Sequence, residues 1–305
     1  MEKTKSKKIG SSEHLTPLSI AILVLLLVYA LMLLGLILWG LLTSVKSAEE
    51  YGNIINSGMY RLPKRIVLHV KEVMDAMKKS ASADSLITMD KVSFFEVFVY
   101  SLLFAGGCAF FKTLVTCLTA YACARFNFKS SKVVYSIVII TMTVPSVGNL
   151  PSELYTVHTL NLYDHIWGVW IMRANFLGLY FLVMYNGFKG MPSALFEAAK
   201  LDGGNNFQIL WHTALPLIKG TFTTVFLIYF VEYWNEYQVP MVYLPTFPTL
   251  GYTVYDSIFG SLKQEIRDVP SQLTLAFTVV LPIVVLYLIF QNKLMGNITV
   301  GGVKG

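Results

Sequence analysis

The chain has few charged residues for its length. Of its 305 residues, 14% are charged and 55% are hydrophobic, whereas soluble domains carry about 25% charged residues. So little charge leaves too little polar surface to face water all round, which predicts a lipid-facing exterior. The net charge of +6 does not indicate a nucleic-acid-binding surface, because Lys and Arg lie in short segments between apolar runs rather than in one clustered stripe.

Two further absences limit the chemistry. The three cysteines, Cys108, Cys117 and Cys123, have no CxxC or Cys/His spacing, which argues against a disulfide framework or metal site and predicts buried thiols. The sequence also has no GxxxxGK[ST] phosphate loop. We therefore expect no cofactor, no metal, no catalytic residue and no ATP hydrolysis by this chain.

Long apolar runs are the main feature that is present. Because a helix needs about 20 residues to cross a bilayer, they predict an all-α polytopic membrane protein with about six transmembrane helices. The first run is too long for the core of a secretory signal, and no small-residue cleavage site follows it, so we expect it to remain as a transmembrane helix. The runs cover residues 18–42, 97–124, 133–150, 166–188, 217–239 and 273–290.

The basic residues predict the orientation. Four lysines lie in the first eight residues, and further Lys and Arg follow the second and fourth runs, whereas residues 151–165 have none. The positive-inside rule then places both termini on the cytoplasmic side of the membrane. We expect that membrane to be a bacterial-type cell membrane. The predicted division is a cytoplasmic tail (1–17), a first transmembrane helix (18–43), an extracytoplasmic segment (44–94), a core domain with five spans (95–290) and a cytoplasmic tail (291–305).

The extracytoplasmic segment contains an apolar stripe at helical spacing. The stripe predicts an amphipathic helix, which would either pack on the outer mouth of the protein or lie on lipid headgroups. Its members are Ile66, Val67, Val70, Val73, Met74 and Met77.

Residues 187–220 form the most informative segment. Pro192 and Ser193 suit the start of a helix, and Gly203 with Gly204 predicts a turn after it. Asn205 and Gln208 predict a capping box for a second helix. The residues alone are compatible with an ordinary cytoplasmic helical hairpin between two spans.

This segment resembles the EAA loop of ABC import permeases, through Glu197-Ala198-Ala199, Asp202-Gly203 and Leu215-Pro216. Other motifs resemble those of sugar permeases of the maltose transporter G-subunit type, in the right order along nearly the whole chain. They are Trp39 to Lys46, Ala120-Tyr121-Ala122 with Arg125-Phe126, Trp234-Asn235-Glu236 and the tail Gly301 to Gly305. The chain departs from that pattern at Gly204 (usually Ala), at Gly220 (often Pro) and in its longer first external segment.

The resemblance implies a permease subunit that translocates a sugar or oligosaccharide. It implies a second permease subunit, two ABC ATPase subunits and an extracytoplasmic sugar-binding protein as partners. The loop at 187–216 would dock on an ATPase, and the residues implied for ATPase coupling are Glu197, Ala198, Ala199, Asp202 and Gly203.

Polar and aromatic residues within or beside the spans are candidates for the substrate pathway. Lys112 lies near the middle of the second run, where a charge costs about 3 kcal/mol on insertion scales. A structural pairing of Lys112 and an interfacial aromatic belt explain the same residues without a pathway. The candidates are Lys112, Asn175, Tyr233, Trp234, Asn235 and Tyr237.

The sequence lacks the features of two other classes of membrane protein. A secondary transporter would need inverted repeats, which the sequence does not show, and a membrane-embedded transferase would need clustered acids at a membrane face. Within ABC importers, a permease for phosphate, a metal or an amino acid is the further alternative.

Overall fold

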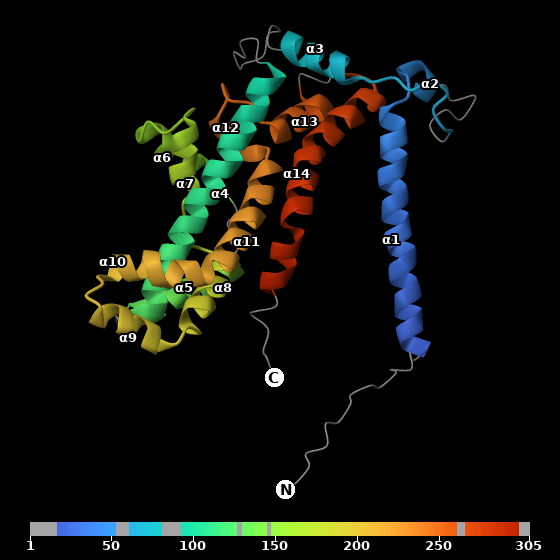
Figure 1. Cartoon of the computed structure of the whole chain (residues 1–305). Helices are drawn as coiled ribbons and strands as arrows, with labels where there is room; N and C mark the ends of the chain where they lie inside the picture. Colours follow the sequence, from blue (N-terminus) through green and yellow to red (C-terminus); the bar gives the residue numbers. More distant parts are fainter. Residues whose placement is uncertain are drawn as a thin grey trace. The chain divides into compact units, whose positions relative to one another are not determined.

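The computed structural model describes residues 17–52, 61–80, 93–126, 130–144, 148–260 and 266–298. These residues form helices and loops, with no β-strand in the described part of the chain (Figure 1). The all-α expectation is therefore confirmed. The N-terminal lysines and the tail from Gly301 to Gly305 lie outside the described residues.

The chain divides into two compact units, and the first comprises residues 1–68. It contains α1 (Pro17–Ser44) and α2 (Ala48–Gly52). α1 has no charged residue, and its side chains are exposed within the unit along most of its length. Near its C-terminal end Gly40, Thr43 and Ser44 are buried. An all-apolar exposed helix of 28 residues is expected of a transmembrane segment.

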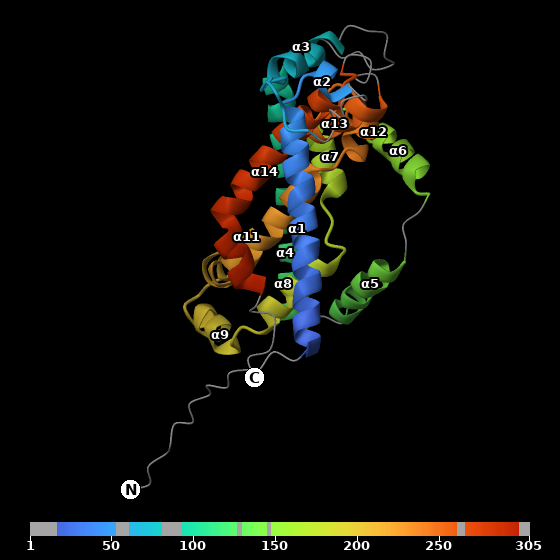
Figure 2. The same cartoon turned by 90° about the vertical axis from the view of Figure 1, so that its right-hand side faces the viewer.

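The second unit, residues 69–305, is a bundle built around α4 (Phe94–Arg125). α4 packs against α7 (Ile166–Arg173), α8 (Leu179–Lys189) and α11 (Leu215–Trp234). Figure 2 shows this unit from another side, with α9 at one end and α3 and α13 at the other. α14 (Val269–Ile298) packs against α11, and also against α13 and α3. The remaining elements of this unit are α3 (Val70–Ser80), α5 (Ser131–Thr143), α6 (Leu150–Thr159), α9 (Ser193–Leu201), α10 (Asn206–Ile209), the π-helical turn η1 (Leu210–Ala214), α12 (Gln238–Tyr243) and α13 (Leu250–Phe259).

Small residues let neighbours approach α4 closely. The indole of Trp170 on α7 occupies the place where a Cβ on Gly107 would lie, and its Nε1 donates a hydrogen bond to the Leu103 carbonyl at 3.0 Å. Close packing over small residues is typical of helix contacts in membranes. The three cysteines of α4 are buried free thiols, as the sequence predicts.

In the part of the chain that the structure describes, four helical segments are long and apolar enough to cross a membrane: α1, α4, Asn206–Trp234 and Val269–Gln291. The other two expected spans are divided. The third run contains α5, which ends at Thr143, and α6 begins only at the last residue of the run, Leu150. The fourth gives α7 and α8, separated by residues 174–178. Gly178 is the N-cap of α8 at φ 132°, a conformation that favours glycine, and hydropathy alone does not show this break.

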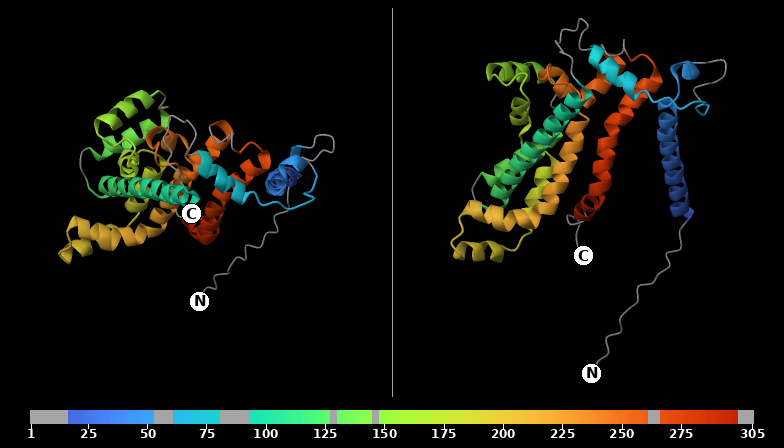
Figure 3. Two further views of the ribbon diagram at one scale, coloured as in Figure 1. Left: turned by 90° about the horizontal axis from the view of Figure 1, so that it is seen from above. Right: turned by 45° about the horizontal axis from the view of Figure 1, so that its top comes forward.

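The short elements of the second unit gather at two ends of its bundle. α9 and α10 lie at one end, and α3, α6, α12 and α13 lie at the other (Figure 3). The helix expected from the external apolar stripe is present, but it begins at Val70 rather than Ile66. Residues before it are not helical, because the Val67 amide instead donates to the Val45 carbonyl at 2.9 Å. Among the stripe residues whose burial the structure describes, Val73 is buried, and α3 packs on α14 and α4.

Candidate functional site

The loop between α8 and α11 carries a short helix, α9, with a sharply defined end. Pro192 is its N-cap, and Asp202 is its C-cap. Gly203 has φ 81°, its amide donates to the Lys200 carbonyl at 3.0 Å, and the Gly204 amide donates to the Ala199 carbonyl at 3.0 Å. This pair of hydrogen bonds is a Schellman motif, which needs a left-handed residue at Gly203.

The family-type alanine at position 204 would not fit this geometry unchanged. A Cβ on Gly204 would lie 2.8 Å from the Ala199 carbonyl oxygen. The glycine therefore matches the tight end of α9 in this chain, and the departure from the family pattern has a local structural reason.

The predicted coupling residues divide by exposure. Glu197, Ala198, Asp202 and Gly203 are exposed, and Ala199 is half-buried. The buried side of α9 is formed by Phe196. The structure thus brings the five predicted coupling residues onto one short element whose charged and small side chains are accessible.

A second short helix returns the chain to the bundle. Asn205 and Gln208 form the predicted capping box: the Gln208 amide donates to Asn205 Oδ1 at 2.8 Å, and the Asn205 amide donates to Gln208 Oε1 at 2.9 Å. The π-helical turn η1 follows, and the Leu215 amide donates to the Leu210 carbonyl. Pro216 has no amide hydrogen, so the wider turn accommodates its entry into α11.

Within the bundle, Lys112 meets two aromatic rings. Its Nζ lies 4.3 Å from the Tyr229 ring centroid and 5.3 Å from that of Tyr233. Both tyrosines are buried, on successive turns of α11. Tyr180 on α8 packs edge-on against Tyr229, with centroids 5.1 Å apart. A lysine and three tyrosines from three helices therefore form one cluster, referred to below as the lysine–tyrosine cluster.

Asn175 lies beside this cluster. Its carbonyl accepts a hydrogen bond from Thr116, one turn beyond Lys112 on α4, at 3.4 Å. Glu232, also on α11, is exposed. The structure therefore brings together three of the six predicted pathway residues: Lys112, Asn175 and Tyr233.

The other three predicted pathway residues lie apart from the cluster. Trp234 is buried, and its Nε1 donates to the Val279 carbonyl on α14 at 3.1 Å. The Asn235 side chain donates to the Val231 carbonyl at 2.8 Å. Tyr237 stacks on Tyr255 with ring centroids 4.4 Å apart. Trp234 and Tyr237 thus have packing roles in this structure.

Sequence reasoning missed several residues around these candidates. Tyr229 and Tyr180 were not singled out, although the four-residue spacing of Tyr229 and Tyr233 places them on one helix face. Arg173 forms an ion pair with Glu153 at 3.2 Å, with about a quarter of each side chain exposed. Near that pair, burial raises the pKa of the Tyr243 hydroxyl, and the negative charge of Glu153 raises it further.

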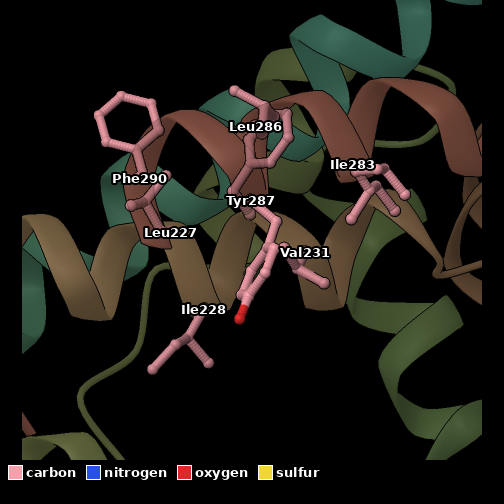
Figure 4. A pocket seen from close by; sticks show the side chains of 9 residues that line it. Leu227, Ile228, Val231, Ile283, Leu286, Tyr287 and Phe290 are labelled. Carbon is pink, nitrogen blue, oxygen red and sulfur yellow. The ribbon is translucent and has the colours of Figure 1, made fainter. Parts of the chain in front are cut away.

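A groove of about 380 Å³ lies between α11 and α14 (Figure 4). Its lining is hydrophobic, and the Tyr287 hydroxyl is the one polar group that a lining side chain carries. Such a surface suits a lipid chain or another apolar helix rather than a polar solute. The lining residues are Leu227, Ile228, Phe230, Val231, Ile283, Val284, Leu286, Tyr287 and Phe290.

A bundle of apolar helices with a short capped helix ahead of a membrane-long segment is the architecture expected of a membrane permease component. Residues 113–293 match the family described as "Binding-protein-dependent transport system inner membrane component". The chain belongs to this family, which is a family of transport permeases and not of enzymes, and it is therefore a multi-pass membrane protein.

The chain is also similar in sequence and in structure to known transport proteins. A probable permease for starch degradation products from Thermoanaerobacterium thermosulfurigenes is 28% identical over 214 residues, 68% of this chain and 76% of that protein. The melibiose/raffinose/stachyose import permease of Bacillus subtilis is 26% identical over 219 residues, 71% and 78% of the two chains. A bacterial ABC transporter involved in alginate import has the same fold, with TM-score 0.70 and 22% identity over 90% of this chain and 95% of that chain.

Proposed function

We propose that this chain is a permease subunit of an ABC importer that translocates a sugar or oligosaccharide into the cytoplasm. The observation that carries the proposal is the exposed α9, with Glu197 and Ala198 on its accessible side, within a chain of the binding-protein-dependent family. The saccharide class rests on the relatives, whose names state starch degradation products or melibiose, raffinose and stachyose.

In this proposal α9 docks on a separate ATPase subunit. The small side chains of Ala198 and Ala199 permit close approach, and the exposed carboxylate of Glu197 offers a charge-assisted hydrogen bond. The loop is anchored in α8 and α11, and both helices pack on α4. A displacement of α9 during the ATPase cycle would therefore reach the centre of the bundle.

The lysine–tyrosine cluster is the proposed pathway-facing part of the chain. Ionisable residues inside a membrane commonly face a bundle interior or a wet cavity. Lys112 is half-buried and Glu232 is exposed. The ammonium of Lys112 and the carboxylate of Glu232 are therefore available to form hydrogen bonds with the hydroxyl groups of a saccharide, beside the aromatic rings of the cluster. Asn175 and Tyr233 extend the same surface.

A single subunit supplies half of such a pathway. The proposed assembly therefore contains a second permease subunit in a heterodimer, two ATPase subunits and an extracytoplasmic binding protein. The α9 end of the bundle and both termini would face the cytoplasm, because the basic residues of the sequence concentrate in those segments.

Purification and reconstitution test this proposal. The tagged chain, extracted in mild detergent from its native membrane, should bring with it a second permease and an ATPase with a phosphate loop. In proteoliposomes, the complex with its binding protein should take up a member of a labelled panel of maltodextrins, raffinose-type saccharides and oligouronates when ATP is supplied. Uptake of phosphate, metal ions or amino acids instead of every saccharide would exclude a sugar importer, and recovery of a transport-competent chain without an ATPase would exclude an ABC importer.

A further inference from the structure

The last residue of α4 contacts the loop between α8 and α11, referred to below as the coupling loop, at two points. Arg125 Nη2 donates a hydrogen bond to the Met191 carbonyl at 2.8 Å. The guanidinium Cζ also lies 3.7 Å from the centroid of the Phe196 ring. Met191 precedes the N-cap of α9, and Phe196 is the buried residue of α9. One side chain therefore contacts both the entry to α9 and its inward face.

Three aromatic side chains pack together beside this contact. Tyr121, one turn before Arg125, packs edge-on against Phe188 of α8, with centroids 5.3 Å apart, and against Phe126 at 5.8 Å. Phe188 and Tyr121 are buried. Closely packed interiors transmit strain rather than absorb it, so the end of α4, the end of α8 and the start of α9 form one joint.

The chemistry of the contact favours arginine specifically. Arg125 forms no ion pair with a carboxylate among the described residues. A planar guanidinium can lie on a ring and direct its N–H groups to a carbonyl at the same time, whereas a lysine ammonium has no plane to stack. α9 otherwise packs on α10 and η1, which follow it in the chain, and Arg125 adds a link to the central helix.

We propose that Arg125 is a positioning residue of the coupling loop. It fixes the orientation of α9 relative to α4. A movement imposed on α9 is then transmitted to the bundle and is not absorbed by bending of the loop. The inference rests on the proposed function in one respect, namely that α9 is the element a partner ATPase moves. The competing explanation is a topology signal, which needs only a positive charge and would be served equally by lysine.

Three variants separate these explanations. Arg125→Gln removes the charge and the stacking, and Arg125→Lys keeps the charge and removes the planar stack. Lys132→Gln is the matched control, because it removes a basic residue from the same inter-helix segment, and Lys132 is exposed. Each is made in the full chain within its native complex, reconstituted with the saccharide of the labelled panel that the wild-type complex takes up.

Hydrogen–deuterium exchange over residues 193–201 measures how firmly α9 is held. The amount of saccharide taken up per ATP hydrolysed measures how well movement of α9 is transmitted to the bundle. Both Arg125 variants should accelerate exchange in α9 by about tenfold, the factor that corresponds to losing one such contact, with α8 unchanged. Both should also lower uptake per ATP, at equal amounts of assembled complex. Lys132→Gln should match wild type in both measurements.

The outcomes are distinguishable from failure of the proposed function. If the wild-type complex shows no ATP-dependent uptake, the proposed function fails irrespective of Arg125. If wild type transports normally and Arg125→Lys matches it in exchange and in uptake per ATP, the positioning role is overturned and the charge acts as a topology signal. Faster exchange in α9 with unchanged uptake per ATP would likewise overturn the proposal that the joint transmits motion.

Discussion

The ammonium of Lys112 lies 4.3 Å from the centroid of the Tyr229 ring, so a cation of α4 packs on an aromatic face of α11. These two helices pack extensively on one another. An insertion cost of about 3 kcal/mol for a mid-span charge is offset in part by a cation–π interaction of about 2 kcal/mol in a desolvated setting. In the proposed function, the ammonium of Lys112 also forms hydrogen bonds with a passing solute.

We expect Lys112→Met to slow saccharide uptake by about tenfold, because a lost interaction of about 1.4 kcal/mol with the passing solute corresponds to that factor. The chain should still reach the membrane, since methionine is tolerated there. Initial uptake rates at equal protein level measure the effect, and Lys219→Met, at an exposed position near the start of α11, is the control. Normal uptake by Lys112→Met would assign the lysine to helix packing alone.

Gly107→Ala should destabilise the packing of α4 on α7. A Cβ at position 107 would overlap the Trp170 indole, whereas one at Gly106 would meet its nearest neighbour, Phe230, at 4.0 Å. Overpacking of this kind costs about 1–3 kcal/mol. Thermal unfolding of the detergent-solubilised complex should therefore show a lower midpoint for Gly107→Ala than for Gly106→Ala. Equal midpoints for the two variants would show that Trp170 can move aside without cost.

Hydropathy and local signals predicted much of this fold. Apolar runs marked α1, α4 and α14, and the Asn205–Gln208 capping box was predicted from residue types alone, because these signals depend only on near neighbours in the chain. The division of the fourth span was not predictable in that way. Residues 174–178 are no more polar than their surroundings, and Gly178, the N-cap of α8, has φ 132°.

The pathway candidates show where sequence reasoning stops. The hydrophobic residues of α11 surround the helix, apart from Lys219 and Glu232 towards its two ends, so its sequence does not show which face meets α14. Trp234 was chosen as a candidate, yet its indole is bound to the Val279 carbonyl. Tyr229 was overlooked, although it is the ring nearest to Lys112. Which side chains share a face with a residue on another helix is a property of tertiary packing.

Reporter fusions test the orientation. A reporter after Gly305 and one inserted near Asp202 should both show cytoplasmic activity, and one near Asn161 should show external activity, because short basic segments are retained in the cytoplasm. Asn161 and Asp202 are both exposed, so insertion should leave the bundle intact. Reporters at Asn161 and Asp202 on the same side of the membrane would contradict the arrangement of spans between them.

The most direct test concerns Gly203, which has φ 81° in the motif that ends α9. A β-branched residue is strained by about 1–2 kcal/mol in that conformation, whereas asparagine adopts it more readily. In proteoliposomes containing the complex, its binding protein and ATP, we measure saccharide uptake and saccharide-stimulated ATP hydrolysis together. The account predicts that Gly203→Asn retains both and that Gly203→Val, assembled to the same level, loses both. Wild-type uptake and ATPase stimulation in Gly203→Val, or saccharide uptake by the wild-type complex without ATP, would contradict the claim that α9 couples ATP hydrolysis to transport.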